Sequence, residues 1–331
     1  MRRALALVLG VALAAPIVPA ASESVAAPAA KTAAKTKRTK KPARVTKKRK
    51  AAAAKRRDAR ARARASTEEP VRARPALLVP IARAISCPVD MVAVAGRVCV
   101  DRFEIGVVDR ESGAAWSPFY TPDLGRAREV VSFYEALRGR AAPGSADAST
   151  DLPALPTIPV APRAVSVRGA IPQGYLSADQ ADGACSAAGK RLCTEAEWVT
   201  ACRGQAQREF PYGDRYEQGT CNVFREDHPS SILHGNPARY HDDPRNGLLV
   251  VADRPLLLET GASPRCASRW GDDAIFDMVG NLDEWVADEQ GAFLGGFYSR
   301  GSKSGCFAKV TAHPRRYSDY STGARCCKDP T

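Results

Sequence analysis

The chain has 331 residues, ten cysteines and a formal net charge of +13 at neutral pH. One segment, residues 31–64, holds 17 Lys or Arg and a single acid, so the rest of the chain carries a net charge of about −3. The basicity therefore belongs to one tract, and it does not indicate a nucleic-acid-binding fold.

The N-terminus has the pattern of a secretory signal. Arg2 and Arg3 precede the apolar run Ala4–Val18, and small residues follow it. This run is too short for a comfortable transmembrane span, whereas its length suits the apolar region of a signal peptide. We therefore expect residues 1–22 to be a signal peptide, and the mature protein to be periplasmic or secreted without a transmembrane segment.

Residues 23–82 contain the basic tract and have no aromatic residue. Such a composition cannot bury a core, so we expect a disordered linker or tail rich in Ala, Lys and Arg. Like-charged blocks bind polyanions, which outside the cytoplasm are the anionic surfaces of the envelope. The tail is thus either an envelope anchor or a solvated spacer, and the missing aromatic residues argue against base stacking with nucleic acid.

Residues 83–331 have the composition of one globular domain and contain all ten Cys and all four Trp. Cysteines in an exported chain usually form disulfides. No CxxC pair occurs, which argues against a zinc ribbon or a thioredoxin-like site. The adjacent Cys326 and Cys327 should bond to different partners, but spacing alone leaves the connectivity open.

The first part of the domain predicts a hairpin and a helix. The alternating apolar runs Met91–Val94 and Val98–Val100 fit a β-hairpin that is bracketed by Cys87 and Cys99. Further on, Val130–Arg138 fits a short helix. Residues 141–162 are rich in Pro and Ala and have little periodicity, so we expect an exposed loop.

Two helices are predicted between residues 177 and 204. Ser177 can cap the first helix, and Thr194 with Glu197 forms a capping box for the second, which closes near Arg203. The following part of the domain has mainly loops and short strands: we expect a polar irregular segment over residues 228–247 and strands at Leu248–Val251 and Leu256–Leu258.

The stretch 276–288, FDMVGNLDEWVAD, places several carboxylates around a Gly280-Asn281 turn. Gly and Asn tolerate the positive φ of a tight turn, which can point backbone carbonyls inward. Carboxylate and carbonyl oxygens are the ligands that Ca²⁺ prefers, although the spacing differs from the helix-loop-helix calcium loop. The alternative is a solvated acidic turn beside a buried Trp285.

A series of motifs then occurs in a fixed order: GKRLCTEAEW (189–198), ACRG (201–204), FPYG followed by Asn222, DMVGNLDEW (277–285), Gly295-Gly296 and GARCC (323–327). In these motifs, across residues 87–327, the chain resembles the sulfatase-modifying-factor domain, the family of the formylglycine-generating enzyme. The resemblance implies an α+β fold of the irregular C-type-lectin-like kind, with little regular secondary structure and stapled by disulfides.

The resemblance also implies metal ligands. A calcium ion would be held by two carboxylates and two backbone carbonyls, those of Asp277, Glu284, Gly280 and Leu282. The family has Asn at the position of Asp277, which is still an oxygen ligand. A second calcium site would use Asn222 and the Val223 carbonyl, but its later carboxylate has no clear counterpart in this chain.

The resemblance implies two disulfides, Cys185–Cys326 and Cys202–Cys306. For the other six cysteines we expect the pairs Cys87–Cys99, Cys193–Cys327 and Cys221–Cys266.

The chain departs from the family at the catalytic cysteines. The family's oxidase binds copper through two cysteines, five residues apart, shortly after the Gly-Gly turn, and soft thiolates suit Cu(I). Here Phe297 replaces the Ser that follows Gly-Gly, and the one cysteine of the stretch, Cys306, aligns with a structural family cysteine. We therefore expect neither copper nor formylglycine-generating activity.

Iron is not expected either. The family's non-haem iron relatives draw three His from a separate helical domain, which this chain lacks, and its four histidines are His228, His234, His241 and His313. His234 and His241 with Asp242 and Asp243 could form a His/carboxylate metal site. A solvated loop is the alternative that we prefer for these four residues.

We expect a calcium-stabilised binding or scaffold module without catalysis. Its ligand would be a peptide or a glycan in a groove formed by aromatic and cationic residues: Phe297, Tyr298, Arg300, Arg315, Arg316, Tyr317 and Tyr320. Two alternatives stay open. One is an oxidoreductase of the formylglycine-generating or non-haem iron type, acting on a protein or a small thiol through residues that we cannot identify. The other is an envelope anchor that works through the basic tail.

Overall fold

The computed structural model of the protein describes residues 85–301 and 303–330. The expected signal peptide, residues 1–22, and the expected basic tail, residues 23–82, lie outside the described residues and stay predictions. Among the helices of residues 85–301 and 303–330, none has the length and apolar character needed to cross a bilayer.

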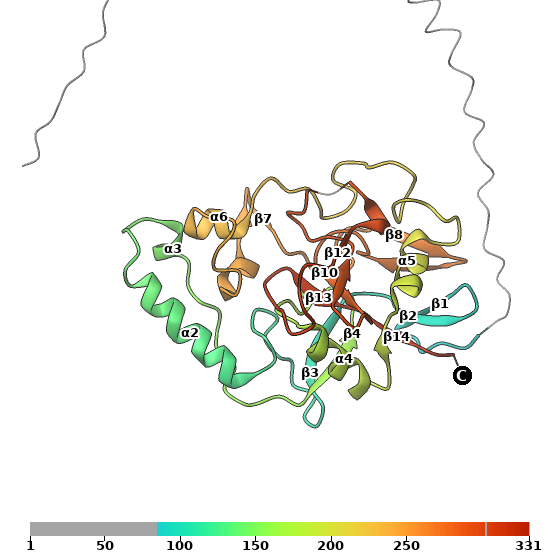
Figure 1. Cartoon of the computed structure of the whole chain (residues 1–331), viewed down its shortest axis with the longest axis horizontal. Helices are drawn as coiled ribbons and strands as arrows, with labels where there is room; N and C mark the ends of the chain where they lie inside the picture. Colours follow the sequence, from blue (N-terminus) through green and yellow to red (C-terminus); the bar gives the residue numbers. More distant parts are fainter. Residues whose placement is uncertain (1–84, 302, 331) are drawn as a thin grey trace, which may run out of the picture. The chain divides into compact units, whose positions relative to one another are not determined.

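Two four-stranded sheets organise the described domain, and the first of them combines strands that are far apart in the sequence (Figure 1). The first has the order β1 (Met91–Val94), β2 (Val98–Asp101), β14 (Cys326–Lys328) and β5 (Arg191–Leu192). The second has the order β12 (Lys309–Val310), β11 (Ala292–Leu294), β10 (Asp283–Val286) and β13 (Thr322–Ala324). The expected hairpin is confirmed as β1 and β2.

Three two-stranded ribbons complete the β structure: β3 (Ile105–Asp109) with β4 (Pro162–Ser166), β6 (Val250–Val251) with β7 (Arg254–Pro255), and β8 (Ala267–Trp270) with β9 (Asp273–Phe276). The expected strand over Leu256–Leu258 is wrong, because the strand that pairs with β6 is β7, which ends at Pro255. Leu256 and Leu257 are instead buried in a cluster with Leu282 and Tyr298.

The helices are α2 (Leu124–Arg138), α3 (Ala146–Ser149), α4 (Ala178–Ala187), α5 (Glu195–Arg203) and α6 (Pro229–His234), with 3₁₀ turns η1 (Pro244–Leu248) and η2 (Gly305–Phe307). Both predicted N-caps are confirmed. Ser177 forms a capping box with Gln180 at α4, and Thr194 forms one with Glu197 at α5. Each box satisfies backbone N–H groups that would otherwise have no partner at the helix start.

Helix α2 is longer than the expected helix at Val130–Arg138. It begins at Leu124, because the Asp123 side chain accepts a hydrogen bond from the Arg126 N–H and caps the helix. Leu124, Ala127, Val130 and Tyr134 are its buried residues, and their spacing of three or four residues places them on one face. The expected loop over residues 141–162 also contains the short helix α3.

The polar segment 228–247 is not a solvated irregular loop. It contains α6 and most of η1, and the side chains of Asp243 and Arg245 within it are fully buried. Charged residues are rarely buried unless they are paired, and these two form an ion pair with a distance of 2.6 Å. The polar composition of this segment therefore led to a wrong prediction of solvent exposure, because its buried charged side chains pair with one another inside the fold.

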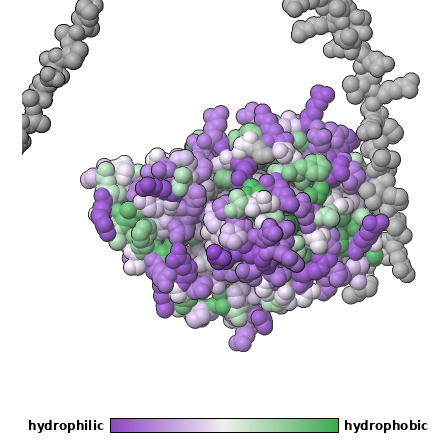
Figure 2. Space-filling view, in the orientation of Figure 1, coloured by the Kyte–Doolittle hydropathy of each residue, from purple (hydrophilic) through white to green (hydrophobic). Residues whose placement is uncertain are grey.

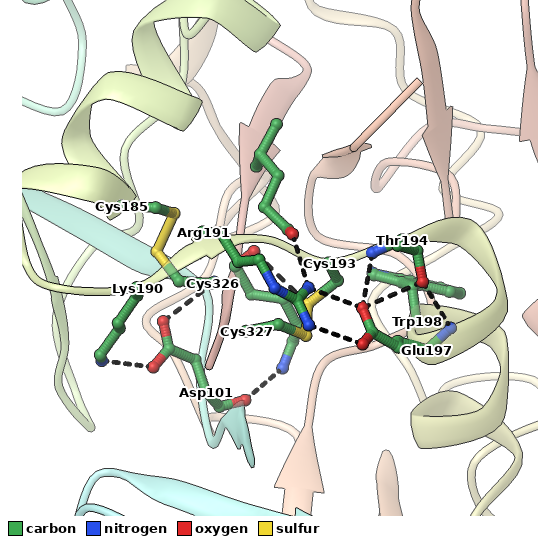
Figure 3. The surroundings of a disulfide bond; sticks show 12 residues. Asp101, Cys185, Lys190, Arg191, Cys193, Thr194, Glu197, Trp198, Cys326 and Cys327 are labelled. Carbon is green, nitrogen blue, oxygen red and sulfur yellow. Dashed lines mark hydrogen bonds and ion pairs between the residues drawn. A yellow bond between two sulfur atoms is a disulfide. The ribbon is translucent and has the colours of Figure 1, made fainter. Parts of the chain in front are cut away.

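Five disulfides staple the domain, and they are the five pairs that we expected: Cys87–Cys99, Cys185–Cys326, Cys193–Cys327, Cys202–Cys306 and Cys221–Cys266. Successive side chains of a strand point to opposite faces. On β14, Cys326 therefore reaches Cys185 of α4 while Cys327 reaches Cys193 on the other side (Figure 3). This explains how two adjacent cysteines can join two different elements. The expected α+β class, irregular and stapled by disulfides, is confirmed.

Candidate functional site

The Gly280-Asn281 turn connects β9 to β10 and packs against the chain around Asn222. Gly280 has a φ of +83°, and a Cβ at this position would lie 2.2 Å from the Asn222 carbonyl oxygen. Only glycine allows this approach. The Asn281 N–H donates to the same oxygen at 2.8 Å, and the Asn222 side chain donates to Asn281 Oδ1 at 3.0 Å. The structure thus brings the residues of both expected calcium sites to one turn.

A buried cluster of charges lies behind this turn. The Arg325 guanidinium donates to both oxygens of Glu284, each at 2.6 Å, and the Trp198 indole donates to one of them at 2.6 Å. Glu104 accepts hydrogen bonds from the Asn281 side chain and from the Leu282 N–H. Sequence reasoning missed Glu104 and Arg325, because their roles depend on contacts with residues that are 177 or 178 positions away for Glu104 and 41 positions away for Arg325.

The cluster carries more negative than positive charge. Glu104, Asp277 and Glu284 are three buried carboxylates, Arg325 is the buried guanidinium that faces them, and the charge of Arg168 also acts on Asp277. Burial, followed by the nearby Asp277 and Glu284, raises the pKa of Glu104 well above its ordinary value. Burial also raises the pKa of Asp277 to about 6, although its hydrogen bond from the Gly261 N–H opposes the rise. An added cation at this place would relieve the excess of negative charge.

The expected calcium ligands fit only in part. Both oxygens of Glu284 are already hydrogen-bonded to Arg325, so this carboxylate is not a free ligand. Within the described residues, no group of three or more His, Cys, Asp or Glu side chains is arranged to hold a metal ion. By contrast, Asn222 Oδ1 is buried beside the turn without a hydrogen-bond partner in residues 85–301 and 303–330. A cation would thus depend on Asn222, Asp277 and backbone carbonyls more than on Glu284.

The expectation that the aromatic residues near Gly296–Arg300 line a groove is wrong. Phe297, Tyr298 and Tyr320 are buried together in one apolar cluster. The nearby Arg300 forms an ion pair with Asp283 and lies over the Phe297 ring, 5.1 Å from its centre. The aromatic side chains after Gly295-Gly296 therefore pack into the core and do not line an open groove, because burial of large aromatic rings is favourable.

No cysteine is free to bind copper after the Gly-Gly turn. Cys306 is bonded to Cys202 of α5, and each of the other eight cysteines of the sequence is also in a disulfide. A thiolate, not a disulfide sulfur, is the copper ligand and the nucleophile. In its oxidised form the chain has no side chain for the copper chemistry of the family.

The alternative His/carboxylate metal site is a buried ion-pair network instead. His234 lies between two carboxylates: its Nε2 is 2.9 Å from Asp243 and its Nδ1 is 3.6 Å from Asp147. Arg245 also pairs with both, at 2.6 Å and 2.7 Å. This network joins α3, α6 and η1, while His241 lies apart from it, 3.8 Å from Asp319.

A polar cavity opens beside this network. Its volume is about 570 Å³, and it lies between the N-terminal ends of α2 and α4, residues 238–242 and residues 316–318. Arg316 and Tyr317 are the residues of the expected groove that line it. His241 lines it too, together with Arg126 and Arg239, which the sequence had not singled out. The cavity can accept a ligand, and its wall is mainly polar and charged.

These features define a disulfide-stapled α+β domain with a buried charge cluster and a polar cavity. Residues 162–326, about half of the chain, match the model of the sulfatase-modifying factor enzyme 1-like domain. The chain belongs to this family as a divergent member. The expected membership is thereby confirmed, and the irregular C-type-lectin-like architecture that it implies agrees with the short strands and few helices described above.

Two bovine proteins are similar to this chain over part of their length. The chain is 29% identical over 119 residues to the inactive C-alpha-formylglycine-generating enzyme 2 of Bos taurus, which covers 36% of this chain and 33% of that protein. It is 29% identical over 118 residues to the formylglycine-generating enzyme of Bos taurus, covering 34% and 26%. The match thus spans about a third or less of these relatives. A solved structure, the major tropism determinant U1 variant, aligns with 15% identity and a TM-score of 0.37 over 75% of this chain and 54% of that one.

Proposed function

We propose that this chain is an exported, non-catalytic binding module of the sulfatase-modifying-factor family. The observation that carries the proposal is the pairing of all ten cysteines, which leaves no thiolate at the position where the family's oxidase binds copper. The inactive relative named above is in keeping with it. Five disulfides support export, because they persist in oxidising compartments. The cavity between α2 and α4 provides a place for a ligand.

The thiol state and the oxidase activity test the proposal together. The mature protein is unfolded without reductant, alkylated and weighed by mass spectrometry, and we expect no alkylated cysteine. A cysteine-containing peptide is then incubated with the protein, copper and oxygen, and we expect no formylglycine product. Conversion of the peptide that is lost in a Cys306→Ser variant would establish the oxidase alternative and overturn the proposal.

We also propose that Ca²⁺ binds at the Gly280-Asn281 turn and stabilises it. The supporting observations are the excess of negative charge at Glu104, Asp277 and Glu284 and the unpartnered Asn222 Oδ1. Asp277, Asn222 and the carbonyls of Gly280, Leu282 or Val223 would hold the ion. Oxygen ligands of this kind suit a hard cation.

Calcium removal is expected to lower the melting temperature. A ligand present at a hundredfold excess over its Kd adds about 2.7 kcal/mol to stability, which corresponds to about 5–10 °C for a domain of this size. The measurement is thermal unfolding with EDTA and after addition of excess Ca²⁺, with Mg²⁺ as the matched control. An Asp277→Ala variant should lose the response to Ca²⁺. Equal melting temperatures with EDTA and with Ca²⁺ would contradict calcium binding at this turn.

A further inference from the structure

Three cavities lie along helix α2 and meet at one residue, Tyr240. The cavity described above has a volume of about 570 Å³, the second about 320 Å³ and the third about 470 Å³, and Tyr240 lines all three. The first two also share Arg126, Val130 and Asp242. We call these three adjacent cavities together the Tyr240 groove. It runs between α2 on one side and α6 with the following residues 235–242 on the other.

Tyr240 is held in an unusual conformation at the centre of the groove. Its φ is +58°, a value that bulky residues rarely adopt. The turn is fixed by hydrogen bonds from the Asp243 N–H and the Asn246 side chain to the Tyr240 carbonyl oxygen. Its ring lies 4.6 Å from the ring of His234. Such strain is maintained where surrounding contacts demand it, often at binding sites.

One end of the groove presents cations that lack a partner. Arg239 and Arg316 are exposed, line the first cavity and form no ion pair or hydrogen bond with the described residues. Arg126 is already balanced by Glu129 and Asp242, each at 3.1 Å. The second oxygen of Asp242 accepts the Tyr134 hydroxyl. The positive charge of this end is therefore available for an anionic group of a ligand.

The other end of the groove has apolar side chains among polar ones. Phe133 of α2 lines the second cavity although 54% of its surface is exposed. Leu137, Ala141, Ile232 and Leu233 line the third. On the face shown in Figure 2, hydrophobic colour gathers at the left edge, where Figure 1 places α2 and α3. An exposed aromatic residue beside an apolar hollow indicates a contact surface.

We propose that the Tyr240 groove binds an extended peptide that carries acidic residues at one end and apolar residues at the other. The acidic side chains or terminal carboxylate would pair with Arg239 and Arg316, and the apolar side chains would cover Phe133. Helix α2 has 15 residues, so it is about 22 Å long, which six or seven residues of an extended peptide would span. This inference rests on the proposed binding role and names its class of ligand.

Two other occupants fit less well. The chain's own segment 31–64 carries a charge of +16 and would be repelled by the free arginines. A highly charged glycan would match the arginines but would leave the Phe133 end without a partner. The apolar side chains at the Phe133 end therefore favour a peptide.

The test uses the mature protein and fluorescent heptapeptides, read by fluorescence anisotropy. The probe has two Glu followed by five residues chosen from Leu, Phe and Ala, and the matched peptide has Gln in place of Glu. We expect the Glu peptide to bind at least about tenfold more tightly, and the difference to shrink as salt is raised. An Arg239→Gln/Arg316→Gln variant should remove this preference for the Glu peptide. A Phe133→Ser variant should lower the affinity for both peptides by the same factor.

The matched control is an Arg110→Gln/Arg128→Gln variant. It loses the same charge at exposed arginines that line none of the three cavities, so its affinity should stay within about twofold of the original. The proposal is overturned if the Glu peptide does not bind, if both double variants lose affinity equally, or if a sulfated oligosaccharide binds at the same arginines and the peptide does not. Any of these results would leave the oxidase test above unaffected, so the two proposals can fail separately.

Discussion

Replacement of Arg325 by Met is expected to lower the free energy of unfolding by about 3–5 kcal/mol, or to prevent folding. Arg325 is fully buried and donates to both oxygens of Glu284, with Glu104 and Asp277 nearby. Removal of the guanidinium leaves the buried Glu284 without its ion-pair partner and also removes the positive charge that faces Glu104 and Asp277, although Arg168 still acts on Asp277. Breaking a buried pair from one side costs far more than the pair itself contributes, because the remaining charge stays out of water.

Denaturant unfolding of the variant and of the unchanged protein measures this loss. Arg102→Met is the matched control, because Arg102 pairs at 2.8 Å with Asp273, whose side chain is 53% exposed, and such pairs contribute less than about 1 kcal/mol. Because cations can balance carboxylates, both variants are measured with EDTA present. A loss for Arg325→Met as small as that for Arg102→Met would show that the cluster does not need this charge.

The second large effect concerns the disulfides. Removal of Cys202–Cys306 by a double Ala variant is expected to cost about 5 kcal/mol, against about 3 kcal/mol for Cys87–Cys99, in the chain-entropy account. The reason is loop length, since the first bond joins residues 104 apart and the second residues 12 apart. Cys202 and Cys306 are also fully buried, so the variant leaves a small cavity that adds to the loss.

Thermal and denaturant unfolding of the two double variants checks the order of these losses. Each is compared with the same protein after full reduction, which removes all five bonds. A larger loss for the Cys87–Cys99 variant would mean that local strain or unfolded-state structure, and not loop length, sets the contribution of these bonds.

Local patterns predicted much of the domain. The β-hairpin of Met91–Val94 and Val98–Val100, the N-cap at Ser177 and the capping box at Thr194 were readable, because each depends on residues that are close in sequence. Helix α2 was predicted only in its second half, because its first turns contain Gly125, Arg126 and Arg128, and the apolar periodicity is weak there. Segment 228–247 was misread for a related reason, because charges that pair inside the fold look like solvated charges in a sequence.

Site residues divide in the same way. The acidic turn at Asp277–Glu284 was visible as a motif, and so was the missing second cysteine after Gly295-Gly296. The turn's partners, Glu104 and Arg325, were not visible, because the residues just before β3 and between β13 and β14 approach the turn only in the folded chain. The aromatic residues Phe297, Tyr298 and Tyr320 were assigned to a groove, since sequence gives a side chain's chemistry but not whether other side chains cover it.

The sequence by itself determined the disulfide-stapled class of this protein, its family motifs and the absence of a thiolate pair, because these follow from residue identity and spacing. Only the tertiary structure decided where charge is balanced, at Arg325 and Glu284, and where the part of the chain that it describes provides no partner, at Arg239 and Arg316. Charge balance depends on distances between groups far apart in the chain and on their removal from water. The groove along α2 likewise exists only after α6 has folded against it.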